Sequence, residues 1–187
     1  MNQNQAYNYF FKIPFYRHSI KPVHILNNEG QIVGSLQRIY NCLYDRVIDA
    51  FLSLANKKNF IVKLRDSPKS FFSAAPVPYK ESLFRDKWII LISEKGDSQQ
   101  IGMFINTSKI KTNPRFEYTK NNQTFIFKNG FLDKNIYVED ESKQVIARIF
   151  YEKVTSMRST YIHIQQENVL NHDELLLLAF IFTSITD

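Results

Sequence analysis

The stretch DELLLLAFIFTSITD (residues 173–187) decides the fold of this chain, because eight consecutive apolar residues run from Leu175 to Phe182. No polar residue interrupts this run at the period of a half-exposed helix or strand. A helix that crosses a bilayer needs about 20 apolar residues, and Thr183 and Ser184 end the run too early for that. The segment therefore has to be buried inside protein.

The residues before this run indicate a helix rather than a buried strand. Asn171 and Glu174 have the spacing of a capping box, with Asn in place of the usual Ser or Thr. Asp173 and Glu174 also place negative charge in the first turn, where the helix dipole favours it. A helix that is apolar on all sides is buried on all sides.

Most of the remaining sequence consists of short apolar segments separated by turn residues, and this pattern predicts about twelve β-strands. Gly30, for example, marks the turn of a hairpin. The expected strands are residues 9–15, 22–26, 31–36, 60–65, 70–75, 87–93, 100–106, 115–120, 123–130, 135–140, 144–150 and 161–166.

Strands of this length, tilted in a barrel, span roughly 15–20 Å, and a fourteen-residue helix is about 21 Å long. Twelve strands enclose a hole wide enough for one helix. We therefore expect residues 1–187 to form a single domain, a mainly β fold in which a closed antiparallel barrel of about twelve strands surrounds the apolar C-terminal helix. The alternative is a β-sandwich in which this helix is tucked between a sheet and a helix over residues 36–56.

A second helix is predicted over residues 36–56, where apolar side chains recur every three or four positions. We expect this apolar stripe to pack on the sheet, with Cys42 as a small packing residue, and Asp49 to lie on the outer surface. Docking on a membrane or a partner helix is the alternative, although the polar positions carry both charge signs. The stripe consists of Leu36, Tyr40, Leu43, Val47, Phe51 and Leu54.

The two hairpins and the last segment resemble a known family. ILNNEGQIVGSLQRIY, NIYVEDESKQVIARI and NHDELLLLAFIFTSITD are similar to segments of small bacterial proteins of the superfamily that joins tubby C-terminal domains, LURP-one-related proteins and phospholipid scramblases. The resemblance covers about residues 20–187. It implies a twelve-stranded barrel around a central C-terminal helix.

The resemblance implies little about activity, but it favours lipid binding. Tubby domains bind phosphoinositides through basic residues on the barrel wall, but those positions have no residue-by-residue match here. Scramblases carry clusters of acylated cysteines, which a chain with Cys42 alone lacks.

Charge is distributed unevenly and suggests where an anionic ligand would bind. Residues 1–138 hold 20 Lys and Arg against 10 Asp and Glu, whereas residues 139–187 hold 4 against 8. Basic residues concentrate in 57–69 and 109–128, and such patches attract polyanions, although a solvated basic face is the alternative. In the second segment the cations interleave with Phe116 and Tyr118, which would either stack on a ligand or point into the barrel. The candidate anion-binding residues are Lys109, Lys111, Arg115, Lys120, Lys57, Lys58, Lys63 and Arg65.

Several other chemistries lack a motif. The four histidines do not have zinc-ligand spacing, and no phosphate-binding glycine loop or nucleophile elbow is present. The acidic run 139–141 is expected to form a hairpin turn rather than a calcium loop. We expect no metal site, no cofactor and no catalytic group. With one cysteine and no signal-peptide pattern, a cytoplasmic protein is expected.

The favoured function is therefore non-enzymatic binding of an anionic ligand, such as a phospholipid or phosphoinositide headgroup at the inner membrane surface. A protein-interaction scaffold without lipid binding is the first alternative. Nucleic-acid binding is a weaker one, because only the charge supports it.

Overall fold

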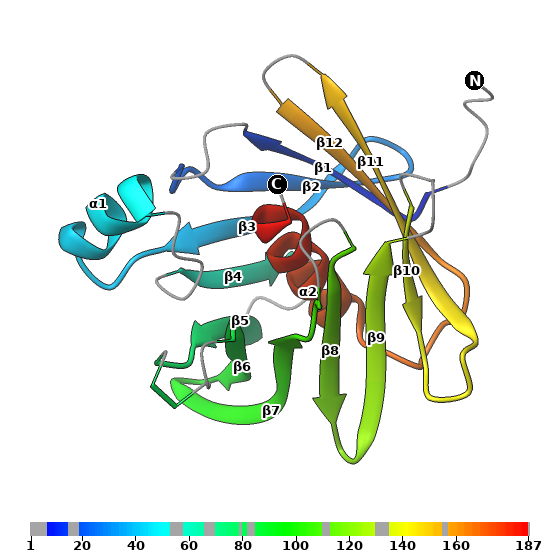
Figure 1. Ribbon diagram of the computed structural model, residues 1–187. Helices are drawn as coiled ribbons and strands as arrows, with labels where there is room; N and C mark the ends of the chain where they lie inside the picture. Colours follow the sequence, from blue (N-terminus) through cyan, green and yellow to red (C-terminus); the bar gives the residue numbers. More distant parts are fainter. Residues whose placement is uncertain are drawn as a thin grey trace.

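The structure is a β-barrel closed around one helix (Figure 1). The computed structural model describes residues 7–14, 19–52, 58–65, 70–78, 80–81, 85–109, 113–129, 135–154 and 157–186. Its strands are β1 (Tyr9–Pro14), β2 (Val23–Asn27), β3 (Ile32–Ile39), β4 (Asn59–Leu64), β5 (Ser70–Pro76), β6 (Lys87–Glu94), β7 (Asp97–Asn106), β8 (Arg115–Lys120), β9 (Gln123–Asn129), β10 (Asn135–Glu139), β11 (Val145–Val154) and β12 (Met157–Ile164). Its helices are α1 (Leu43–Leu52) and α2 (His172–Ile185).

Each strand pairs antiparallel with its neighbours in sequence, and β1 pairs with both β2 and β12, which closes the barrel. The prediction of a closed barrel of about twelve strands is confirmed. Inward and outward side chains alternate as the pleat requires, for example along β4, where Phe60 and Val62 are buried and Lys63 is exposed. Neither helix in the described part of the chain is long and apolar enough to cross a bilayer.

Helix α2 fills the barrel, as the apolar run predicts. Every residue from Leu175 to Phe182 is at most 2% exposed. Phe180 packs edge-on against Phe60 of β4, whereas Phe182 packs against Phe116 of β8, on a different part of the wall. Side chains two residues apart on a helix are rotated by about 200°, so Phe180 and Phe182 point in nearly opposite directions and both meet the sheet. The surrounding wall explains why no polar face is tolerated.

The N-terminal end of α2 is fixed by polar contacts. The Asn171 side chain accepts a hydrogen bond from the Asp173 backbone N–H at 2.8 Å, so the predicted N-cap is confirmed. Glu174 does not complete a capping box with it. Its buried carboxylate instead accepts a hydrogen bond from the Tyr118 hydroxyl and pairs with the Lys120 ammonium at 2.7 Å.

Two buried arginines hold the other end of α2. The Arg38 guanidinium donates to the Ser184 hydroxyl at 2.9 Å, and that of Arg158 donates to the Thr183 carbonyl at 2.7 Å. Cations at this end also complement the negative end of the helix dipole. Because all faces of the helix are equally apolar, we infer that polar contacts at both ends set its rotation and depth in the barrel.

The predicted helix 36–56 is wrong in two respects. Residues 36–39 continue β3, where Leu36 points into the core, and the helix begins only at Leu43. The side of the helix that faces the barrel is also not the one that was expected. Asp49, expected on the outer surface, is fully buried, while Leu43 and Val47 are exposed. Cys42 is exposed as well, so it is not a packing residue. The described structure ends α1 at Leu52, so Leu54 lies outside the described residues.

The burial of Asp49 has a clear cause. Its carboxylate accepts a hydrogen bond from the Tyr40 hydroxyl at 2.6 Å and pairs with the Lys58 ammonium at 3.1 Å. The Lys58 carbonyl in turn accepts a hydrogen bond from the indole of buried Trp88 at 3.2 Å. This charge pairing attaches α1 to the barrel through Asp49.

Candidate functional site

The basic candidates separate into paired and unpaired cations. Lys58 is buried in its ion pair with Asp49, and Lys120 is bound to the buried Glu174. A cation that already has a carboxylate partner is a poor contact for a second anion, because the partner would have to be displaced. Lys58 and Lys120 are therefore structural residues.

The aromatic residues of segment 109–128 do not form a stacking surface. Phe116, Tyr118, Phe125 and Phe127 all point into the barrel and are at most 2% exposed. The exposed-aromatic interpretation of this segment is wrong, and the alternative, in which these rings build the core, is confirmed.

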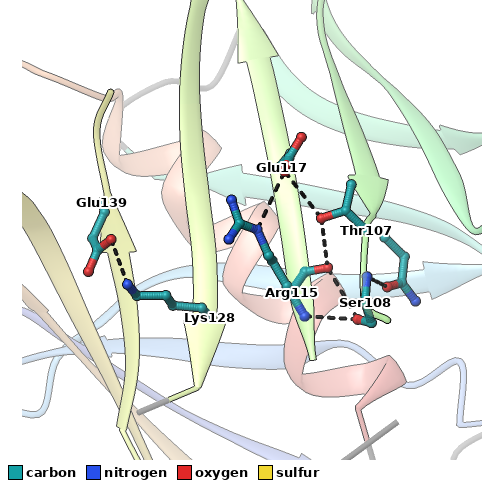
Figure 2. Close-up of polar contacts among 7 residues, drawn as sticks. Thr107, Ser108, Arg115, Glu117, Lys128 and Glu139 are labelled. Carbon is teal, nitrogen blue, oxygen red and sulfur yellow. Dashed lines mark hydrogen bonds and ion pairs between the residues drawn. The ribbon is translucent and has the colours of Figure 1, made fainter. Parts of the chain in front are cut away.

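Arg115 lies on the outer wall, but its position is tied to neighbours on β8 and in the β7–β8 connection (Figure 2). Its guanidinium Nε lies 3.4 Å from Glu117 Oε1, and its backbone N–H donates to the Ser108 hydroxyl at 2.8 Å. Nearby Lys128 pairs with Glu139 at 2.8 Å, as Figure 2 also shows. Lys109 is exposed, and it forms no ion pair with another described residue.

Two candidates, Lys57 and Lys111, lie outside the described residues. The remaining two, Lys63 and Arg65, lie together on the outer wall at the end of β4. Both are exposed, and neither forms an ion pair with another described residue. They differ in this respect from Lys58, Lys120 and Arg115.

Lys63 and Arg65 line a cavity of about 750 Å³ on the outside of the barrel. Strand register explains how distant segments meet there. His24 on β2 lies opposite Ser35 on β3, and Ser35 lies opposite Lys63 on β4. The cavity is lined by His24, Ile32, Gly34, Ser35, Lys63, Leu64, Arg65, Ser70, Phe71, Ser93, Lys95 and Gly96.

Contacts within the wall hold the cations at the cavity. The Lys63 ammonium lies 5.2 Å from the centre of the Phe71 ring, a cation–π arrangement that leaves the charge accessible. The Arg65 backbone N–H donates to the Val33 carbonyl at 2.8 Å, which continues the β3–β4 pairing by one residue. The third cation, Lys95, lies in the β6–β7 turn with a positive φ of 52° next to Gly96.

The chemistry of this lining suits an oxyanion. Among the described residues that line the cavity, three are Lys or Arg and none is acidic. Ser35, Ser70 and Ser93 add hydroxyl groups that can donate hydrogen bonds, and Ser93 Oγ is itself 2.7 Å from Ser98 Oγ. A guanidinium, two ammonium groups and hydroxyls together form a typical donor set for a phosphate group.

Three parts of this cavity are absent from the residues predicted from the sequence, namely Lys95, His24 and the serines. The segment EKGD (residues 94–97) between two predicted strands indicates a hairpin turn, so Lys95 could be placed on a turn. Its proximity to Lys63 depends on the pairing of β4, β5 and β6, for which the local sequence carries no signal.

A metal site is a different question from anion binding. Within the described ranges, no three His, Cys, Asp or Glu side chains gather closely enough to hold an ion. The acidic run 139–141 forms the predicted turn, in which Asp140 and Gln144 exchange hydrogen bonds.

Comparison with known proteins identifies the fold family. A family model described as Tubby C-terminal like domain matches residues 9–185, nearly the whole chain. Searches of curated proteins and of solved structures gave no significant match. The family is one of binding folds, and its barrel around a C-terminal helix agrees with the structure. The chain therefore belongs to the family of Tubby C-terminal like domains.

Proposed function

We propose that this protein, acting as a single domain, binds the anionic headgroup of a phospholipid or phosphoinositide at the inner membrane surface. The observation that carries the proposal is the convergence of Lys63, Arg65 and Lys95 on one outer cavity without an ion-pair partner in the described residues. Membership of a binding-fold family supports a non-enzymatic role.

The electrostatics favour this cavity over the rest of the basic surface. Each Lys or Arg near an anionic membrane contributes about 1 kcal/mol, and the effect decays within a Debye length. A cation without a carboxylate partner contributes the full attraction to the membrane. Arg115 and Lys128 contribute less, because their carboxylate neighbours offset much of their charge. Three cations without an ion-pair partner in the described part of the chain give weak, salt-sensitive binding.

The test is vesicle sedimentation with matched double variants. The binding variant is Lys63→Gln/Arg65→Gln, and the control is Arg115→Gln/Lys128→Gln, which removes the same formal charge from paired residues. Vesicles of phosphatidylcholine alone are compared with vesicles that also contain phosphatidylserine or a phosphoinositide.

We expect wild type to bind only the anionic vesicles and to dissociate as salt rises. The binding variant should lose roughly thirtyfold in affinity, the equivalent of two contacts of about 1 kcal/mol each, and the control less than about threefold. Equal binding to neutral vesicles, or equal losses in both variants, would show that the cavity is not the binding site.

A further inference from the structure

Exposed apolar side chains gather along one strand of this barrel. Six large hydrophobic residues are strongly exposed in the described structure, and five of them lie on β3 or beside it. Single exposed apolar residues are normal, but a contiguous group marks an interaction surface. The six are Ile20, Ile32, Leu43, Tyr44, Val47 and Val169.

The chain places these five residues along β3 or just beyond it. Ile32 is the first residue of β3. Ile20 is held near the end of β3, because its carbonyl accepts a hydrogen bond from the Gln37 side chain at 3.1 Å. The other three belong to α1, which begins shortly after β3 ends and projects from the barrel beyond it (Figure 1). Val169 lies between β12 and α2.

Helix α1 is turned with its apolar side outward. Asp49 faces the barrel, and about 100° per residue places Leu43, Tyr44 and Val47 on the opposite side of the helix. These three side chains are 75%, 71% and 45% exposed. A helix that packed on the barrel through an apolar stripe would show the reverse, with such residues buried.

The cations of the proposed site lie on the same side. Ile32 lines the cavity together with Lys63 and Arg65, so one edge of the exposed apolar group is also an edge of the cavity. Strand β3 connects this cavity at its beginning to α1 beyond its end. Exposed apolar side chains beyond one end of β3 and cations at its other end, without an ion-pair partner among the described residues, complement an anionic lipid surface, which presents phosphates above an acyl layer.

We propose that the side formed by β3 and α1 is a membrane-docking surface, in which Leu43, Tyr44 and Val47 insert into the headgroup–acyl boundary while Lys63 and Arg65 hold a lipid phosphate. This inference rests on the proposed function and adds the orientation of the barrel on the membrane. Tyrosine and aliphatic side chains are well suited to this boundary, because the ring has an apolar body and a polar hydroxyl.

The mixed charges of α1 do not oppose this arrangement. Asp45 and Asp49 lie on the barrel side of the helix by the same rotation of about 100° per residue, and Asp49 is neutralised by Lys58. The acidic groups therefore do not face the phosphates. The cavity supplies the positive charge that an interfacial helix usually carries on its own polar face.

One experiment measures insertion with a fluorescent reporter. Tyr44→Trp places an indole on the exposed side of α1, and Trp88, the sole tryptophan of the chain, is fully buried and serves as the internal reference. Vesicles of phosphatidylcholine and phosphatidylserine with brominated acyl chains should quench the new indole and shift its emission to the blue. No quenching on vesicles that sediment the protein would overturn the inference.

A second experiment measures the energetic contribution of the apolar side. Leu43→Ser/Val47→Ser should lower the apparent partition coefficient on the same vesicles at least about tenfold, whereas Val169→Ser should leave it within about twofold of wild type. All these positions are exposed, so stability in urea should not change.

The outcomes separate this inference from the proposed function. If Lys63→Gln/Arg65→Gln lowers vesicle binding and Leu43→Ser/Val47→Ser does not, the docking surface is refuted and headgroup binding stands. The same result is expected if α1 instead binds a protein partner. If Lys63→Gln/Arg65→Gln binds like wild type, the proposed function fails, and the inference fails with it.

Discussion

Replacing Glu174 by Gln tests whether the polar contacts at the start of α2 hold the helix in the barrel. The substitution keeps the shape of the side chain but removes its charge. The Tyr118 hydroxyl then donates to a neutral amide, and the Lys120 ammonium loses its carboxylate at 2.7 Å. The amide N–H₂ group would also face a donor where the structure requires an acceptor.

The expected loss of stability follows from burial. A hydrogen bond to a charged group contributes about 1.5–3 kcal/mol, and Glu174 has no access to water that would replace it. Partial exposure of Lys120 allows that ammonium to be solvated, which places the expected loss at about 1.5–3 kcal/mol. For a chain of this size, with a urea m-value of roughly 2–3 kcal/mol/M, the midpoint should fall by about 0.5–1.5 M.

The assay is urea unfolding followed by the fluorescence of Trp88, which is fully buried in the barrel. The matched control is Glu117→Gln, the same change in a residue that pairs with Arg115 on the outer face of β8. That pair is 46% and 37% exposed, so its loss should cost less than about 0.5 kcal/mol. Equal shifts in the two variants would refute the view that Glu174 fixes the helix.

Three further predictions concern the same core. Leu178→Ala should cost about 2–5 kcal/mol in urea unfolding, because the surrounding wall cannot collapse into the space; a loss under about 1 kcal/mol would mean the helix is peripheral. Gly102→Ala should cost about 1–3 kcal/mol by the same measurement, since its Cβ would lie 2.6 Å from the Tyr118 ring and hydroxyl, and an unchanged midpoint would contradict this packing. Burial, and then Glu174, raise the pKa of Tyr118 far above its ordinary value of 10.0. Its contribution is therefore complete below about pH 10 and is lost as pH rises further, because only the unfolded chain releases the proton. Tyr118→Phe should lower stability at neutral pH and reduce its alkaline slope; an identical slope would show that this hydroxyl is not responsible.

The sequence predicts the barrel well because its strongest signal, the apolar run from Leu175 to Phe182, has few structural solutions. It misplaces the second helix for a physical reason. Leu36 and Leu43 are seven residues apart, as on a helix, yet one belongs to β3 and the other to α1. Arg38 belongs to β3 but points inward, where it is buried against the C-terminal end of α2. A charged residue at an inward position breaks the alternation of apolar and polar residues that would have identified the strand.

The candidate site was only partly predictable. Counting cations identifies Lys63 and Arg65 but gives equal weight to Lys58 and Lys120, whose partners Asp49 and Glu174 are distant in sequence. Which carboxylate each lysine pairs with depends on the strand register and on the depth of α2 in the barrel. Both are properties of tertiary packing that no local sequence pattern carries.

The most direct test of the central claim, that the cavity on β3–β6 binds an anionic headgroup, is an NMR titration with a water-soluble inositol trisphosphate. Amide signals of Ser35, Lys63 and Ser93 should shift together and saturate, because all three residues line the cavity. Those of Ser108 and Arg115 should stay in place. Shifts centred on Arg115, or small shifts at every exposed lysine without saturation, would contradict the account.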